Sequence, residues 1–176
     1  MRFKMRKLIL LIIPLILAAI LLTPVSALPK SNTQFTEHIT MTAGGISQGS
    51  QTVQGNILYV ENGISEGIVT GTSGFDLSGA LWTKLSGYYD MATGLGRFSG
   101  KWIITVPSGD TFEGNVAGVI STIDPNNFHI EGSYVGFGTG NFKGDKIKGS
   151  FSGNAIAGVL SVELDMTGSL NDKSKK

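Results

Sequence analysis

The sequence predicts an all-β protein built as a single antiparallel barrel of eight strands, and three observations lead to that fold class. Apolar and polar residues alternate with a period of two in one short stretch after another, as in strands with one buried face. Gly, Pro, Asn and Asp separate these stretches. The chain also contains 25 glycines, and glycines within strands permit the bends that closing a small barrel requires. A β-sandwich is the alternative arrangement of the same strands.

The N-terminal segment, residues 1–27, has the composition of a signal peptide. Four basic residues precede an apolar run from Leu8 to Leu22. Small residues follow at Val25 and Ala27, the two positions before the cleavage site that a signal peptidase recognises. We therefore predict cleavage near Ala27 and a secreted or extracytoplasmic location at the cell envelope. The alternative is an uncleaved anchor, but the run is shorter than the roughly 20 apolar residues of a spanning helix.

The expected barrel domain, residues 33–170, begins with four strands. The first shows alternation from Phe35 to Met41, and a longer alternating stretch predicts a second strand over 51–60. The sequence Glu61-Asn62-Gly63 predicts a turn, after which 67–72 is the third strand. The fourth strand is expected over 81–89, where alternate residues lie on opposite faces of the strand.

The second half of the domain continues the pattern. Strands over 101–106 and 111–120 form a hairpin around the turn sequence Pro107-Ser108-Gly109-Asp110. A strand follows over 128–134, after a turn at 124–127, and a short one over 146–152. The clearest alternation in the chain, from Ile156 to Met166, predicts the last strand. The polar residues 171–176 are expected to form a disordered tail.

One phrase, G-x-G-x-F-x-G, occurs twice, at 94–100 and at 138–144. The second copy lies in a longer stretch, which begins at Gly136-Phe137 and is followed by Lys148-Gly149-Ser150-Phe151. This stretch resembles a hairpin of the allene oxide cyclase and dirigent barrels. The resemblance implies an eight-stranded antiparallel barrel with an apolar lumen, often assembled as a trimer. It also implies a cyclase or isomerase acting on an apolar substrate. The doubled phrase departs from the family's single copy, and no motif here matches the family's catalytic carboxylate.

Composition excludes several kinds of chemistry. The chain has no cysteine, and its two histidines, His38 and His129, lie in no metal-binding or hydrolase motif, so we expect no metal and no cofactor. Without the four basic residues of the signal segment, ten Lys and Arg stand against 13 Asp and Glu, a net charge of −3. The folded part therefore lacks the basic footprint of a nucleic-acid-binding protein.

Among the carboxylates, Glu37 is the one candidate for catalysis. It shares a strand face with apolar residues, whereas Glu131, Glu163 and Asp165 alternate with them and are expected to face solvent. If that face of the first strand is interior, burial would raise the pKa of Glu37 into the range of a catalytic acid or base. A frayed first strand that exposes Glu37 is the alternative.

Aromatic and aliphatic residues give the candidate binding site: Trp102, Phe128, Ile130 and Tyr134, each on an apolar strand face. Ordinary core packing is the alternative role for them. An eight-stranded barrel is wide enough either to be filled by side chains or to hold one small ligand. Gly132 and Gly136 flank Tyr134 on its face, and we expect their missing side chains to leave space in the lumen.

The sequence therefore leaves three functions open. The first is an exported, non-enzymatic barrel that binds a small apolar ligand or an envelope partner. The second is a cyclase or isomerase acting on an apolar substrate, and the third is a structural envelope protein that forms homo-oligomers, such as a trimer. A membrane contact is expected only through an uncleaved signal segment.

Overall fold

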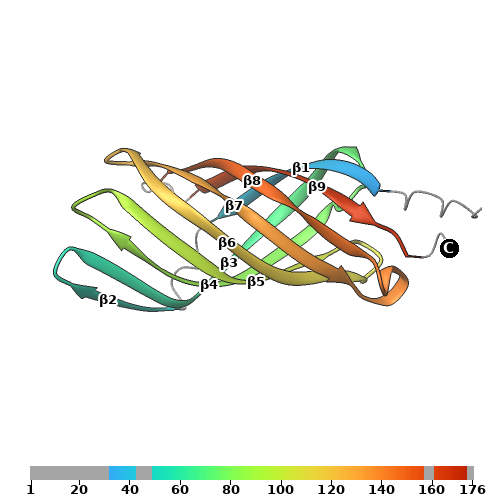
Figure 1. The fold of residues 1–176 in the computed structure, drawn as a ribbon, viewed down its shortest axis with the longest axis horizontal. Helices are drawn as coiled ribbons and strands as arrows, with labels where there is room; N and C mark the ends of the chain where they lie inside the picture. The colour runs from blue at the N-terminus through green and yellow to red at the C-terminus, as the bar shows by residue number, and fades with distance from the viewer. Residues whose placement is uncertain (1–31, 43–48, 157–160, 174–176) are drawn as a thin grey trace, which may run out of the picture.

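A computed structural model describes residues 32–42, 49–156 and 161–173. In these residues the chain forms nine antiparallel strands and one short 3₁₀ turn, η2 (Figure 1). The strands are β1 (Asn32–Thr42), β2 (Ser50–Gln54), β3 (Ile57–Gly74), β4 (Gly79–Asp90), β5 (Leu95–Thr105), β6 (Thr111–Asp124), β7 (Asn127–Gly138), β8 (Lys146–Ile156) and β9 (Ser161–Asn171), with η2 (Gly140–Phe142) before β8. The predicted signal segment lies outside the described residues.

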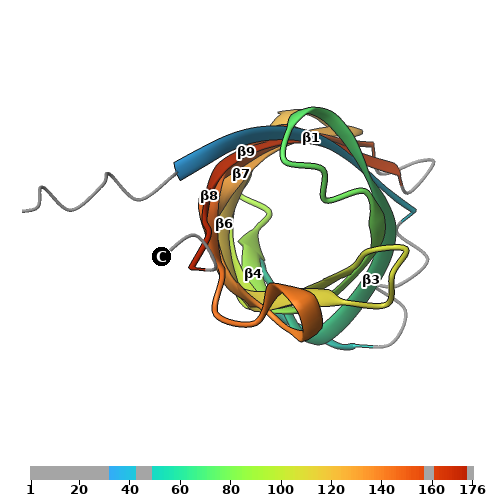
Figure 2. The same ribbon diagram turned by 90° about the vertical axis from the view of Figure 1, so that its right-hand side faces the viewer.

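The sheet closes on itself, so the predicted fold class, an eight-stranded antiparallel barrel, is confirmed. Strands pair in the order β1-β9-β8-β7-β6-β5-β4-β3, and β1 pairs with β3 to complete the ring (Figure 2). Closure leaves no exposed edge along the ring. The ninth strand, β2, pairs only with the first part of β3 and extends the sheet beyond the ring (Figure 1).

Two of the predicted strand boundaries are wrong. The stretch 51–60 is a hairpin of β2 and β3, because the chain reverses in a two-residue loop that starts with Gly55 at a φ of 62°. The turn expected at Glu61-Asn62-Gly63 is instead a bulge inside β3, where the register against β4 shifts and Asn62 has a φ of 56°. One long strand therefore replaces the two expected ones.

The last predicted strand also divides. Ile156 ends β8 and pairs with Ser161 at the start of β9, so Ile156 and Met166 belong to neighbouring strands. Gly158 and Leu160 lie outside the described residues. At the C-terminus β9 reaches Asn171, and the N–H of Lys173 donates to Asp145 Oδ1 at 2.9 Å. Residues 174–176 of the predicted tail lie outside the described residues.

Large inward side chains fill the middle of the barrel by packing over inward glycines. A Cβ on Gly132 would lie 2.4 Å from the ring of Phe151, and one on Gly136 would lie 2.4 Å from the ring of Trp102. Gly118 faces the ring of Phe98 in the same way. The expectation that Gly132 and Gly136 leave empty space is therefore wrong, because rings from β8 and β5 occupy it.

One end of the barrel, which we call the plugged end, is closed by the connection between β3 and β4, residues 75–78. Figure 2 looks onto this end and shows the connection turning inward across the ring. Leu77 of the connection is completely buried, as are Phe112 and Ile147. The rings of Phe75, Phe112 and Phe142 contact one another, with centroids 4.9–6.1 Å apart. Burial of this cluster seals the end with apolar surface.

The two copies of the repeated phrase have different structures. In the first copy Gly94, with a φ of 70°, ends the β4–β5 turn, and the rest of the phrase lies in β5 with Phe98 directed inward. The second copy leaves β7, passes through η2 and ends at Gly144, with a φ of 97°. Only the second copy of the phrase therefore forms a connection between strands, whereas most of the first copy lies within β5.

Candidate functional site

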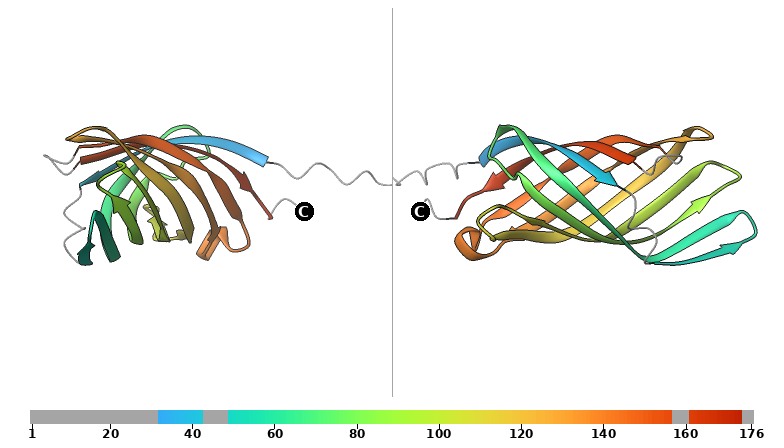
Figure 3. Two further views of the ribbon diagram at one scale, coloured as in Figure 1. Left: turned by 60° about the vertical axis from the view of Figure 1, so that its left-hand side comes forward. Right: turned by 180° about the vertical axis from the view of Figure 1, so that it is seen from behind.

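The end opposite the plug, which we call the mouth, carries the turns β2–β3, β4–β5 and β6–β7 (Figure 3). The four residues predicted to bind a ligand all point into the barrel, but they lie at two depths. Trp102 and Tyr134 are buried in the middle, whereas Phe128 and Ile130 lie nearer the mouth and are only partly buried. The structure thus divides the predicted site into an inner pair and a mouth pair.

The inner pair is tightly held. The rings of Trp102 and Tyr134 meet edge to face at 90°, with centroids 5.9 Å apart. The indole N–H of Trp102 donates to the Asn115 carbonyl at 3.0 Å, and the Tyr134 hydroxyl donates to the Thr167 carbonyl at 3.0 Å. Burial raises the pKa of Tyr134, and the nearby Glu37 raises it further. The rings of Trp102 and Tyr134, with their hydrogen-bonded N–H and O–H groups, therefore form the floor of the lumen beneath the mouth.

The mouth pair has apolar neighbours that are also partly buried. Phe128 contacts Tyr89 edge to face, with centroids 5.8 Å apart, and Ile130 stands opposite Ile120 on β6. The Tyr89 hydroxyl shares a hydrogen bond with Thr122. Met41 and Val162 pair across β1 and β9 on the same inward face and are half-buried as well. The mouth is therefore an apolar rim with solvent-accessible side chains.

Glu37 lies inside the barrel, midway along β1, with no exposed surface. Its Oε1 accepts the Leu77 N–H of the plug at 3.0 Å, and its Oε2 is buried without a hydrogen-bond partner. Burial raises the pKa of Glu37, and the Asp76 charge adds to the rise, against the lowering effect of the Leu77 hydrogen bond. The register of β1 against β3 shifts next to this residue. Glu37 is therefore interior, and the frayed first strand, the more ordinary of the two explanations that the sequence offers, is not observed.

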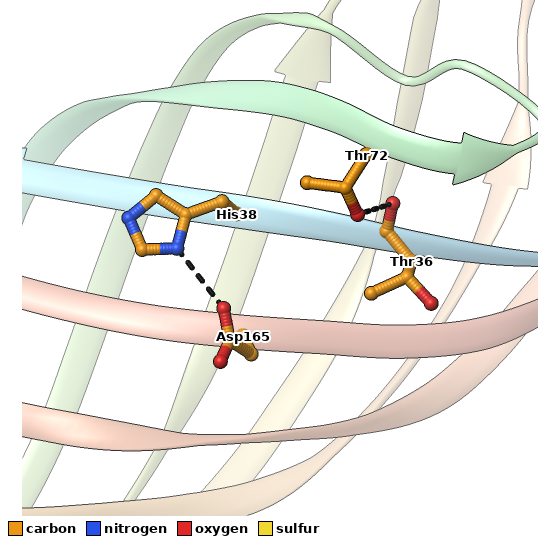
Figure 4. Close-up of polar contacts among 4 residues, drawn as sticks. All are labelled: Thr36, His38, Thr72 and Asp165. Atoms are coloured by element: carbon orange, nitrogen blue, oxygen red, sulfur yellow. Dashed lines mark hydrogen bonds and ion pairs between the residues drawn. The ribbon is translucent and has the colours of Figure 1, made fainter.

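The two histidines lie on the outer face of the barrel with the carboxylates of Glu131, Glu163 and Asp165. Figure 4 shows His38 on β1 with its Nδ1 at 3.0 Å from Asp165 Oδ1 on β9. On the other side of β1, the Thr72 hydroxyl donates to the Thr36 carbonyl at 2.7 Å. The contact between Thr72 and Thr36 spans the β1–β3 seam at which the barrel closes, and the contact between His38 and Asp165 joins β1 to β9. Glu131 and Glu163, like Asp165, are exposed, as the alternation predicts.

Two parts of this arrangement were not identified from the sequence. The plug was missed because Phe75 and Leu77 lie in a short connection between strands, where only their alternation with Asp76 and Ser78 hints at burial. No sequence signal links Tyr89 to the site, because the contact of Tyr89 with Phe128 joins strands far apart in the chain.

Across residues 32–42, 49–156 and 161–173, no three His, Asp or Glu side chains gather as a metal site would require. No helix in these residues is long and apolar enough to cross a membrane. The chain matches no family model, no curated protein and no solved structure. Function must therefore be argued from the barrel itself.

Proposed function

We propose that this protein is an exported binding barrel that takes a small apolar molecule at its mouth. The observation that carries the proposal is the difference between the two ends. At the plugged end Leu77, Phe112 and Ile147 are completely buried beside the partly buried Phe75 and Phe142. At the mouth, by contrast, Phe128, Ile130 and their apolar neighbours all keep solvent-accessible surface. A ligand seated there would remove that surface from water, which favours binding by about 25 cal/mol per Å².

The polar groups of the lumen support an apolar ligand with few hydrogen-bonding groups. The Trp102 and Tyr134 donors are already used by backbone carbonyls, so the floor offers a ligand mainly ring surface. The N-terminal sequence supports export, and an exported protein without cysteine must obtain its stability from its core. Assembly into a trimer stays a prediction.

Binding of diphenylhexatriene, a linear uncharged fluorophore, tests the proposal. We expect the full-length protein to bind it, and the variant Ile130→Glu to bind it at least tenfold more weakly, because a charge at the mouth must be desolvated. Val119→Glu is the matched control, since Val119 lies on the outer face of β6. Ile130→Trp, which fills the mouth without a charge, keeps the test valid if the glutamate variant does not fold. Equal binding by all variants would refute the mouth as the site.

Acid–base catalysis on an apolar substrate is the second candidate, and Glu37 is the observation that favours it. A buried carboxylate with a raised pKa and an unpartnered oxygen is the kind of group that transfers protons in enzymes. Its position beneath the plug, away from the mouth pair, favours binding over catalysis. Glu37→Gln separates the two functions, because a binding barrel keeps its affinity for the fluorophore and an isomerase loses turnover.

A further inference from the structure

We propose that the mouth end of the barrel docks onto a lipid bilayer through a ring of exposed apolar side chains, so that the mouth opens onto the membrane. Nine large apolar side chains in the described residues are exposed, and five of them lie in or beside the turns of the mouth. We call these five the collar: Val53, Met91, Leu95, Ile123 and Ile156. Single exposed apolar residues are ordinary, but their concentration at one end of a barrel marks an interaction surface.

The tips of four hairpins carry the collar (Figure 1). Val53 precedes the β2–β3 turn and Ile123 precedes the β6–β7 turn, whereas Met91 lies within the β4–β5 turn and Leu95 follows it. Ile156 ends β8 and pairs with the first residue of β7, so it lies at the same end. The collar therefore surrounds the mouth and does not belong to one face of the barrel.

Backbone hydrogen bonds join the hairpin tips to one another. The Met91 N–H donates to the Asn56 carbonyl of the β2–β3 turn at 2.8 Å, and the Thr122 N–H donates to the Gly94 carbonyl at 2.8 Å. The collar side chains are thus held in fixed positions, separated by polar turn residues. Separate apolar projections can sink into a deformable lipid surface, whereas a protein partner favours a contiguous, closely packed patch.

Side chains that suit lipid headgroups lie behind the collar on the outer face. Tyr59 of β3 pairs with Tyr88 of β4, which is exposed and lies two residues, or about 7 Å, before the end of that strand. Arg97 of β5 is exposed directly opposite Tyr88. Interfacial segments insert their apolar side chains by roughly 5–10 Å, and Tyr is enriched at the level of the headgroups. Insertion of the collar would place the tyrosines at that level and the Arg97 guanidinium near lipid phosphates.

The charges of the mouth turns favour a zwitterionic bilayer over an anionic one. Asp90 and Asp124 are the charged residues of three turns, at 54–57, 90–95 and 124–127, which contain no Lys or Arg. Backbone N–H groups of the same turns hydrogen-bond both carboxylates at 2.9 Å and lower their pKa, so both are ionised at neutral pH. Docking must therefore come from apolar contact and not from attraction to anionic headgroups.

Docking at the mouth extends the proposed function, on which its role in ligand exchange rests. An apolar molecule dissolves in a bilayer far better than in water, so a mouth that faces the bilayer can take up its ligand without exposing it to solvent. The sequence indicated a membrane contact only through the signal segment, because the collar residues come from four separate hairpins and gather only in the fold.

Single cysteines locate the surface that meets the bilayer, because the chain contains no cysteine of its own. In the full-length protein, Met91→Cys and Phe137→Cys place an environment-sensitive nitrobenzoxadiazole label on the collar and on the plugged end, both at exposed positions. With phosphatidylcholine vesicles, we expect the Met91 label to shift to shorter wavelength and to be quenched by nitroxide lipids, whereas the Phe137 label changes little. A signal segment acting alone would give the reverse, because β1 begins at Asn32, beside the plugged end.

Two double variants, each carrying the Met91 label, test the apolar contacts. Leu95→Ser/Ile123→Ser removes two collar side chains that are 57% and 59% exposed. Burying a half-exposed side chain of this size favours binding roughly fivefold, so the vesicle concentration for the half-maximal shift should rise about 25-fold. The matched control, Ile68→Ser/Phe137→Ser, removes side chains outside the collar that are 63% and 54% exposed, and should raise that concentration less than about twofold.

Docking and ligand binding are tested separately. Leu95 and Ile123 lie on the outer face, so their serine variant should bind diphenylhexatriene in solution as the original protein does. Docking without binding of the fluorophore would refute the proposed function alone.

The docking proposal is overturned if the Phe137 label shifts as much as the Met91 label, or if the collar variant and its control behave alike. Tighter binding to vesicles that contain anionic phosphatidylglycerol than to phosphatidylcholine alone would also overturn it. A shift of the Met91 label that grows with protein concentration in the absence of vesicles would assign the collar to a second copy of the chain instead.

Discussion

Replacing Gly132 by alanine should destabilise the barrel by about 3 kcal/mol or more, because there is no room for a methyl group at this position. A Cβ would lie 2.3 Å from the Ala117 carbonyl oxygen, 2.4 Å from Phe151 Cζ and 2.8 Å from Gly118 Cα. Favourable carbon contacts lie at about 3.5 Å, so the overlaps approach roughly 1 Å. Two of the three clashes involve backbone, which yields only if β6 and β7 separate.

Urea unfolding, followed by the fluorescence of Trp82 and the buried Trp102, measures this change in the free energy of unfolding. Gly63→Ala is the matched control, because an added Cβ there meets only Val60 Cγ1 at 3.2 Å and the Leu85 carbonyl at 3.6 Å. We expect the control to cost less than about 1 kcal/mol. The packing of rings over glycines is refuted if Gly132→Ala lies within 0.5 kcal/mol of the original protein, a margin of about the usual surface effect, or if both variants cost the same.

Three further changes probe the interior. Burial raises the pKa of Glu37, so the folded protein holds this proton more tightly than the unfolded chain; stability is fully present below the ordinary Glu pKa and is lost as pH rises through the folded-state pKa. Glu37→Gln should remove that loss of stability with rising pH in melting temperatures recorded from pH 4 to 9, and an unchanged pH profile would contradict the buried carboxylate. Leu77→Ala should lower the free energy of urea unfolding by about 2–5 kcal/mol, since it empties a fully buried site in the plug; a loss below 1 kcal/mol would mean that the plug is not packed. Tyr134→Phe removes the hydrogen bond to Thr167 and should lower the same free energy by about 1 kcal/mol, whereas a gain in stability would contradict that bond.

Local alternation was enough to predict which residues face inward. Trp102, Phe128, Ile130 and Tyr134 all point into the barrel because a strand's side chains change face at every residue. The same signal cannot detect a tight reversal, so it predicts one strand over 51–60. A two-residue loop at Gly55 keeps the alternation almost uninterrupted while the chain turns back.

The aromatic ring that packs against each glycine of the lumen could not be predicted from the local sequence pattern. The ring of Phe151 reaches Gly132 from β8, and the ring of Trp102 reaches Gly136 from β5, two strands away. Such contacts depend on the stagger of strands around the barrel, which is set by all the pairings together. The same holds for the plug, since Leu77 meets Glu37 across 40 residues of sequence.

The most direct test of binding at the mouth is the position of a bound ligand inside the barrel. A spin-labelled fatty acid bound to the methyl-labelled protein broadens the NMR signals of nearby methyl groups. We predict strong broadening at Ile130, Ile120 and Val162, and little at Ile104 and Ile147, which are buried toward the plugged end. Broadening centred on Ile147, or on the outward methyl groups of Val119, would contradict an apolar site at the mouth.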